Sequence, residues 1–356
     1  MFTRRHFLAS LAAATVAPKL SAEDTVKSHT KIKLGFDNFS IRAMGWKAPQ
    51  LLDHAASLKC DALFISDLES YDSLEDAALA EVRKKAADLG IGIYAGGWSI
   101  CPTSVRFKTS WGGAEALLRT GIRVAKALGS PVFRCVLGAM EDRKTPGGIR
   151  ARMADTVKVL KTARSAALDA GVKIAIENHA GDMHSWELVD LINEAGADFV
   201  GATLDSGNAT WTLEDPLDVL ENLGKFTLCS GTRDSMVWET EDGANVQWTA
   251  PGDGLVDWKK FAARWAELCP QAPVCVESIS GFAKSFPYKK PEFWEHYDKR
   301  PEALAHFEAM AKCGHAIPPF KAEGPDKKLA DQEYQKAELA RSIKYLREVI
   351  GLGVKA

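Results

Sequence analysis

Short apolar runs alternate along this chain with longer segments of helical periodicity. Eight runs have the length of a β-strand, and none alternates cleanly between polar and apolar positions. Strands that are buried on both faces of a parallel sheet have this character. The eight runs are KIKLGF (31–36), DALFIS (61–66), IGIYAGG (91–97), PVFRCVL (131–137), KIAIE (173–177), FVGATLD (199–205), FTLCSG (226–231) and PVCVES (273–278).

The segments between these runs are typical of amphipathic helices. Within residues 149–171, Ile149, Met153, Val157 and Leu160 recur at steps of three or four, and Gly171 ends the pattern. Eight strand–helix repeats predict an α/β fold of the (β/α)8 TIM-barrel type, because right-handed crossovers between parallel strands allow few other arrangements. The alternative is an open doubly wound sheet. It needs a glycine-rich phosphate loop after its first strand, and LGFDNFSIR (34–42) is not such a loop.

Two segments are longer than a minimal barrel requires. Residues 234–254, after the seventh strand, contain Glu-Asp-Gly between Val/Trp-rich arms and predict a hairpin. Residues 281–315, after the eighth strand, are rich in aromatic residues and proline, which indicates a lid or rim over the barrel mouth. A last helix is expected over residues 331–350. We therefore expect a barrel with rim insertions over residues 31–316, followed by a C-terminal tail and helix over 317–356.

The N-terminus has the pattern of a twin-arginine export signal. Arg4 and Arg5 precede an apolar, alanine-rich stretch, and cleavage near Ala22 is expected. The signal, residues 1–22, predicts passage through the twin-arginine export machinery and a periplasmic or otherwise exported location. The alternative is an amphipathic first helix with two unrelated arginines.

Charge and cysteine content narrow the function further. The formal net charge of −2 falls to about −5 without residues 1–22, which contain three basic and no acidic residues. An acidic protein is unsuited to sequence-independent nucleic-acid binding, so no nucleic-acid partner is expected. The seven cysteines form no CxxC pair, which argues against a structural zinc site. The sequence does not indicate the oligomeric state.

Acidic side chains stand at the ends of three predicted strands. Glu177 ends the fifth strand, Asp205 ends the sixth and Glu277 ends the eighth. Strand ends converge at the mouth of a barrel, where active sites lie. Three carboxylates brought together repel one another unless a cation neutralises them. Oxygen ligands favour Mg²⁺ or Mn²⁺, with Zn²⁺ as an alternative if an imidazole takes part.

The runs AIENH, VGATLDSGN, TRDS and VES resemble the sugar phosphate isomerase/epimerase family, whose fold is a xylose isomerase-like barrel. The similarity extends over roughly residues 32–282. It implies a metal held by Glu177, Asp205 and Glu277, with the two glutamates as the acid/base pair. The family's metal-binding histidine after strand seven corresponds to Gly231 here, and Asn208 stands where another histidine is common. His179, Cys229, Ser230 or water remain as candidates for the fourth ligand.

The resemblance implies a metal-dependent isomerase or epimerase of a sugar or sugar derivative. The metal would stabilise an enediolate formed from a keto-sugar, while the glutamates remove and return a proton. Arg233 would hold a substrate oxygen and Asp234 would orient Arg233. His179 and Asn208 are further candidates for substrate binding. An exported enzyme is expected to act on a sugar without phosphate.

Three other functions are compatible with parts of this pattern. A lyase or hydratase acting on keto-glycosides would form the same enolate and then expel a substituent. The missing histidine instead suits a carbohydrate-binding protein that has lost catalysis. An apurinic-site nuclease shares the barrel, but it would need several histidine ligands and a basic groove.

Overall fold

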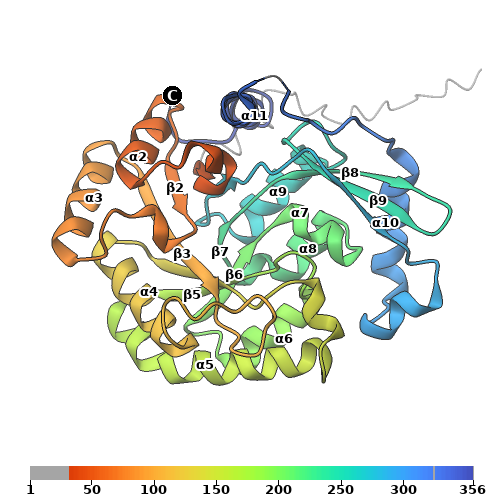
Figure 1. Cartoon of the computed structure of the whole chain (residues 1–356), viewed down its shortest axis with the longest axis horizontal. Helices are drawn as coiled ribbons and strands as arrows, with labels where there is room; N and C mark the ends of the chain where they lie inside the picture. Colours follow the sequence, from red (N-terminus) through yellow and green to blue (C-terminus); the bar gives the residue numbers. More distant parts are fainter. Residues whose placement is uncertain (1–31, 324, 356) are drawn as a thin grey trace, which may run out of the picture.

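The computed structural model describes residues 32–323 and 325–355, so the expected export signal lies outside the described residues. Eight parallel strands form the centre of the molecule and helices surround them (Figure 1). The strands are β1 (Leu34–Asp37), β2 (Ala62–Ile65), β3 (Gly92–Ser99), β4 (Val132–Val136), β5 (Lys173–Glu177), β6 (Val200–Leu204), β7 (Thr227–Ser230) and β10 (Val274–Val276). The helices between them are α2 (Ala48–Ser57), α3 (Asp76–Asp88), α4 (Ala114–Leu128), α5 (Gly148–Ala170), α6 (Ser185–Ala195), α8 (Pro216–Leu223) and α9 (Trp258–Leu268).

The strands form a nearly closed barrel. Neighbouring strands pair in the order β10-β1-β2-β3-β4-β5-β6-β7. A single parallel bridge between Thr232 and Val276 joins the two edges. There the Thr232 amide donates to the Cys275 carbonyl at 2.7 Å, and the Glu277 amide donates to the Thr232 carbonyl at 2.8 Å. The predicted TIM barrel is confirmed, and the open doubly wound sheet is not formed.

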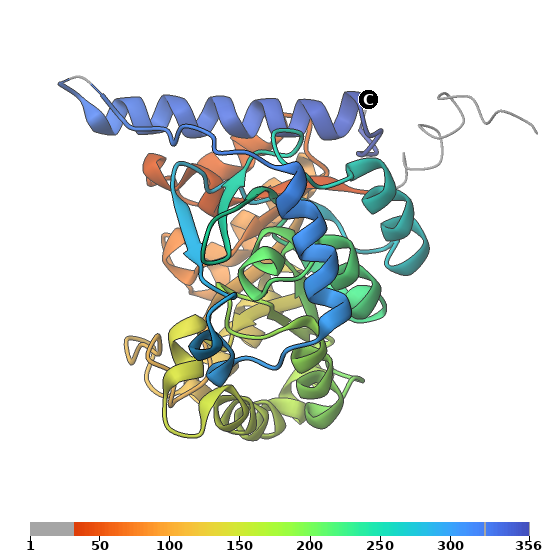
Figure 2. The same cartoon turned by 90° about the vertical axis from the view of Figure 1, so that its right-hand side faces the viewer.

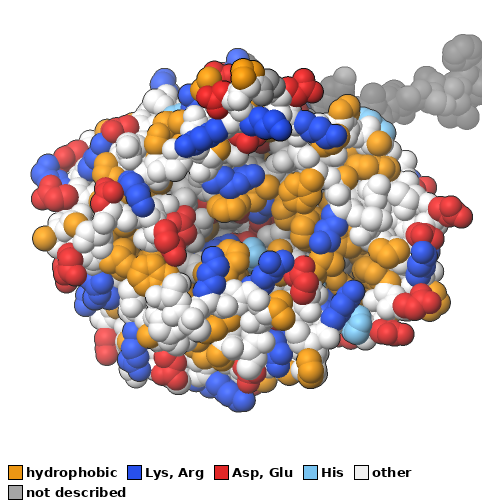
Figure 3. Space-filling model, in the orientation of Figure 1, with side chains coloured by type: hydrophobic (Ala, Val, Ile, Leu, Met, Phe, Trp, Pro, Cys, Tyr) orange, Lys and Arg blue, Asp and Glu red, His pale blue; other side chains and the backbone are white. Residues whose placement is uncertain are grey.

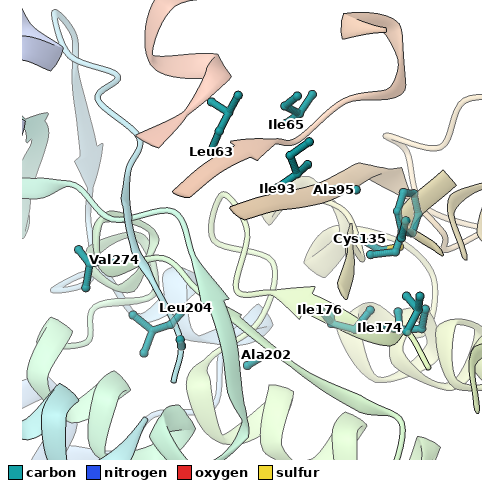
Figure 4. Packing of buried hydrophobic residues seen from close by; sticks show 14 of the residues in the cluster. Leu63, Ile65, Ile93, Ala95, Cys135, Ile174, Ile176, Ala202, Leu204 and Val274 are labelled. Carbon is teal, nitrogen blue, oxygen red and sulfur yellow. The ribbon is translucent and has the colours of Figure 1, made fainter. Parts of the chain in front are cut away.

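Strand burial explains why the apolar runs show no alternation. One face of each strand packs outward against the helices, and Figure 4 shows such outer-core side chains, among them Leu63, Ile93 and Ile176. Side chains of the other face, including Phe64 and Tyr94, fill the barrel interior. The barrel is therefore a packed core on both sides of its wall, as parallel sheets require.

Helix ends follow the sequence signals. Helix α5 ends at Gly171, whose φ of 67° is a left-handed conformation that glycine adopts at little cost. None of the helices in residues 32–323 and 325–355 has the length and apolar character needed to cross a membrane. Short helices complete the connections: α7 (Ser206–Ala209), η1 (Asn38–Met44), η2 (Leu68–Ser70), η3 (Met140–Lys144), η4 (Thr210–Thr212), η5 (Gly224–Phe226) and η6 (Pro291–His296).

The two insertions combine into one structure. Strands β8 (Asp234–Glu239) and β9 (Ala244–Thr249) form the expected hairpin, and β11 (Ala283–Phe286), from the second insertion, pairs antiparallel with β9. Helix α10 (Pro301–Cys313) packs beside this small sheet, as Figures 1 and 2 both show. The two segments far apart in sequence therefore share one satellite core beside the barrel.

The C-terminal helix α11 (Lys327–Glu348) begins a little before the expected start and lies across one side of the barrel (Figure 2). Its Leu339, Ile343 and Leu346 belong to the main core. The chain after it returns to β1 and β2, where the Asp61 carboxylate accepts hydrogen bonds from the Leu34 and Val354 amides, each at 2.9 Å.

Asp234 fastens the insertion to the barrel wall. Its buried carboxylate accepts hydrogen bonds from the backbone amides of Ser235, Gly252 and Val256 and from the Trp258 indole, at 2.8 to 3.0 Å. These donors come from β8, from the loop after β9 and from the start of α9. One carboxylate thus holds three segments together.

We expect Asp234→Ala to lower the free energy of unfolding by about 3 kcal/mol or more, because it leaves four donors without a partner in a buried place. Denaturant titration measures this change. The matched control is Asp253→Ala, which removes a carboxylate from a half-exposed ion pair with Arg341 and should cost at most about 1 kcal/mol. Equal losses in the two variants would contradict the role given to Asp234.

Candidate functional site

Three buried carboxylates converge at the carboxyl ends of the strands. Glu177 is the last residue of β5, Asp205 follows β6, and Glu277 follows β10. One oxygen of each lies within 4.8 Å of the others. We call Glu177, Asp205 and Glu277 the carboxylate triad. The structure thus brings together the three residues that the strand ends indicated.

Two buried arginines compensate part of this negative charge. Nε and Nη2 of Arg134, which points inward from β4, lie 2.6 Å from Glu177 Oε2. Nη2 of Arg233, which lies just before β8, donates to Asp205 Oδ2 and, at 2.7 Å, to Glu277 Oε2. Sequence reasoning missed Arg134, although an arginine within the apolar run PVFRCVL was a visible signal.

The compensation is incomplete. Burial raises the pKa of Asp205 to about 6, although Arg233 acts in the opposite direction. Burial likewise raises the pKa of Glu177 well above its usual value, against the lowering effect of Arg134. A further buried carboxylate, Asp37 at the end of β1, has its pKa raised to about 8 by burial and by the charge of Glu277. Burial therefore makes ionisation of these carboxyl groups unfavourable in spite of the two arginines.

His179 and Asn208 lie beside the triad in different roles. His179 Nδ1 lies 2.6 Å from the Gly138 carbonyl, so Nδ1 carries the proton and Nε2 is free to accept a hydrogen bond. Burial, reinforced by Arg134, lowers the pKa of His179 to about 3 and keeps the ring neutral. The Asn208 amide nitrogen donates to Asp205 Oδ2 at 2.7 Å and to Glu177 Oε1 at 3.2 Å. Its Oδ1 is buried without a partner.

Asp234 is placed differently from what we expected. Its carboxylate binds the insertion, as described above, and does not line the cavity or contact Arg233. Consecutive residues of an extended segment point to opposite sides. Arg233 therefore faces the triad, and Asp234 faces the surrounding structure.

A cavity of about 600 Å³ opens above the triad. Glu277, Arg233, His179 and Asn208 line it, whereas Glu177 and Asp205 are fully buried and do not line it. Its walls carry four tryptophans, Trp98, Trp111, Trp211 and Trp248. Figure 3 shows the hollow on this face, with basic side chains along its edge. Apolar walls with a few polar groups at the floor are the usual form of a small-molecule site.

The structure predicts a pH-dependent stability from Asp37. Because its folded-state pKa of about 8 exceeds the ordinary 3.8, the folded protein binds this proton more tightly than the unfolded chain does. Folding stability should therefore fall as pH rises from about 4 to about 8. Asp37→Asn stays neutral and can keep the Oδ1 acceptor for the Phe39 amide, so its unfolding midpoint should fall less over this range. Thermal melts at several pH values test this, and parallel profiles for the two proteins would refute it.

Solved structures of sugar-handling barrels resemble this chain. A D-psicose 3-epimerase crystallised in the presence of D-fructose has 18% identity, with 90% of this chain and 100% of that chain covered and a TM-score of 0.59. The D-psicose 3-epimerase from Clostridium cellulolyticum H10 with D-tagatose has 15% identity, coverage of 90% and 99%, and a TM-score of 0.57. The IOLI protein with a bound zinc atom has 17% identity, coverage of 78% and 96%, and a TM-score of 0.54. At these identities the likeness concerns the fold alone.

Among curated proteins, none matches the chain in sequence. The family of xylose isomerase-like TIM barrels matches residues 52–297. That range contains the whole carboxylate triad, both arginines and the hairpin insertion. Because the match covers more than half of the 356 residues, the chain belongs to the xylose isomerase-like TIM-barrel family.

Proposed function

We propose that this protein is a sugar isomerase or epimerase that moves a proton next to a carbonyl group through an enediolate. The observation that carries the proposal is the position of Glu277, a carboxylate that lines the cavity and has an oxygen within 4.8 Å of oxygens of Glu177 and Asp205. Sugar epimerases among the similar structures support the same class of substrate. Glu277 is the base that reaches a substrate proton, whereas Glu177, which does not line the cavity, is placed to hold a cation.

The triad fits a divalent metal in ligand type and spacing. Three carboxylate oxygens within 4.8 Å of one another are donors for a hard cation. Burial raises the pKa of Glu177 and of Asp205, and a bound cation would favour their ionised forms. Glu177, Asp205 and Glu277 would hold the ion, with Mn²⁺ or Mg²⁺ as the first choice and Zn²⁺ as the alternative. When bound, the ion polarises the substrate carbonyl.

The remaining residues bind and orient the sugar. The free Nε2 of neutral His179 accepts a hydrogen bond from a sugar hydroxyl. Asn208 and Arg233 also line the cavity and provide further polar groups that can bind the sugar. The tryptophan walls exclude water and pack against the apolar face of the ring. Together these contacts fix the carbon that loses its proton near Glu277.

The place of action that we propose is the cell envelope, reached by the twin-arginine route. The basis is the N-terminal segment with Arg4 and Arg5. A substrate in that compartment is expected to be a free sugar or a sugar derivative without phosphate.

A lyase acting on keto-glycosides is the second candidate, because the cavity is larger than one sugar ring needs. A hexose packed at protein density fills roughly 200 Å³, against a cavity of about 600 Å³. The same proton removal by Glu277 would then lead to loss of a neighbouring substituent.

Exchange of substrate hydrogen with D₂O tests the proposal. We expect NMR to show deuterium entering next to the carbonyl of one or more ketoses in the presence of Mn²⁺, together with the epimer or aldose product. Glu277→Gln should lower the exchange rate by about 10²- to 10⁴-fold, the usual contribution of a general base. Glu239→Gln, an exposed glutamate of the hairpin, is the control and should exchange at the wild-type rate.

The same assay separates the alternatives. Release of the glycosidic substituent from a keto-glycoside, with no epimer formed, would identify a lyase. The enzyme proposal would be overturned if no ketose or keto-glycoside exchanged hydrogen. If sugars then raised the thermal stability without metal, the protein would be a carbohydrate-binding protein.

A further inference from the structure

Three arginines are buried around the barrel mouth, and they differ in how completely they are bonded. Arg134 directs Nε and Nη2 at Glu177 and donates from Nη1 to the Gly97 carbonyl at 2.9 Å. Arg143 likewise uses all three nitrogens, with partners that include Glu187. Arg233 uses only Nη2, while its Nε and Nη1 are buried without a hydrogen-bond partner. Arg233 is thus the incompletely bonded member of the three.

The surroundings of Arg233 nevertheless form a fitted site for its side chain. A Cβ at Gly207 would lie 2.1 Å from Arg233 Cγ, so this position must be glycine for the arginine to pass. The guanidinium lies 4.3 Å from the ring centre of Trp248, which stacks on Trp211 with ring centres 4.2 Å apart. A Cβ at Gly231 would lie 2.7 Å from Glu277 Oε2, the oxygen that binds Arg233. Both glycines therefore favour the contact between Arg233 and the triad.

The bonding of Arg233 combines favourable and unfavourable features. Hydrogen bonds from a guanidinium to carboxylates are stabilising, whereas each buried N–H group without a partner is destabilising. Arg233 makes two such bonds and leaves two nitrogens unpaired. A bare cation has no N–H groups to satisfy. It would replace Arg233 at the triad without paying that cost.

We propose that the Arg233 guanidinium and a divalent cation are competing occupants of the carboxylate triad. In one state Arg233 bridges Asp205 and Glu277. In the other the cation takes these oxygens, and Arg233 turns into the cavity beside it. This inference rests on the proposed function for the use of the triad as a cation site, but it does not depend on which sugar is bound.

The cavity gives Arg233 a place to move. Arg233 already lines the space of about 600 Å³, so a guanidinium that leaves the carboxylates would enter this space. The lower part of the side chain would stay between Gly207 and Trp248. After the movement all of its donors face the cavity, where the substrate oxygens are. Cation binding would therefore also convert Arg233 from an internal counter-ion into a substrate-binding group.

Titration calorimetry with Mn²⁺ alone tests the competition. We expect Arg233→Met to bind Mn²⁺ at least ten-fold more tightly than the wild type, because the competing charge is gone. Arg106→Gln is the matched control. It removes the same charge from the lining of the same cavity, where Arg106 pairs with Glu141, and should change the affinity by less than two-fold. Arg233→Lys keeps a positive charge at this position, so its affinity for Mn²⁺ should lie between those of the wild type and the Met variant.

Thermal unfolding gives a second readout that needs no turnover. Without metal, Arg233→Met should unfold at a lower temperature than the wild type, because the triad then repels itself, and Mn²⁺ should raise its midpoint by more. Equal Mn²⁺ affinities for wild type, Arg233→Met and Arg233→Lys would overturn the competition, even if sugar turnover were observed. Suppose that the Met variant binds Mn²⁺ more tightly and that the wild type turns over no sugar. This result would support the competition and count against the proposed enzyme.

Discussion

Repulsion among buried carboxylates is the constraint on which the rest of this structure depends. The barrel brings the ends of β5, β6 and β10 together, and each carries an acid whose partner acids lie within 4.8 Å. Such a cluster persists only if cations or protons reduce its charge. Arg134 supplies one cation from within β4, and Arg233 supplies another. The raised pKa values of Asp205 and Asp37 show that the balance is still unfavourable to ionisation.

The insertions that distinguish this chain from a minimal barrel also contact the charged groups of the triad region. Strand β9 carries Trp248, whose ring covers the Arg233 guanidinium and whose indole donates to the Gly207 carbonyl at 2.9 Å. Trp211 stacks behind Trp248, and the Lys284 ammonium lies 4.5 Å from the ring centre of Trp211. Lys284 itself belongs to β11, in the second insertion. The small sheet therefore reaches from the surface to the triad through one stack of rings and cations.

Much of the fold and part of the site could be predicted from the sequence. The eight apolar runs correspond to the eight barrel strands, because a strand that is buried on both faces has apolar residues at nearly every position. The triad was predictable because strand ends meet at one edge. The sequence also contained signals for Arg134 and for the outward direction of Asp234. These are an arginine inside an apolar run and the opposite directions that consecutive residues of an extended segment take. The bonding of Arg233 could not be predicted, because it depends on which side chains the insertions bring to Gly207 and Glu277.

The glycine at position 231 takes on a different meaning once these contacts are known. By family resemblance alone, a missing histidine suggests a weakened metal site. In the structure, however, a side chain at this position would meet the Glu277 oxygen that Arg233 binds, and Arg233 in turn requires a glycine at position 207. The two glycines, the arginine and Trp248 form one packing arrangement. Gly207 leaves room for the Arg233 side chain, and Gly231 leaves room for the Glu277 oxygen that Arg233 binds. We conclude that glycine at position 231 permits the contact between Arg233 and Glu277.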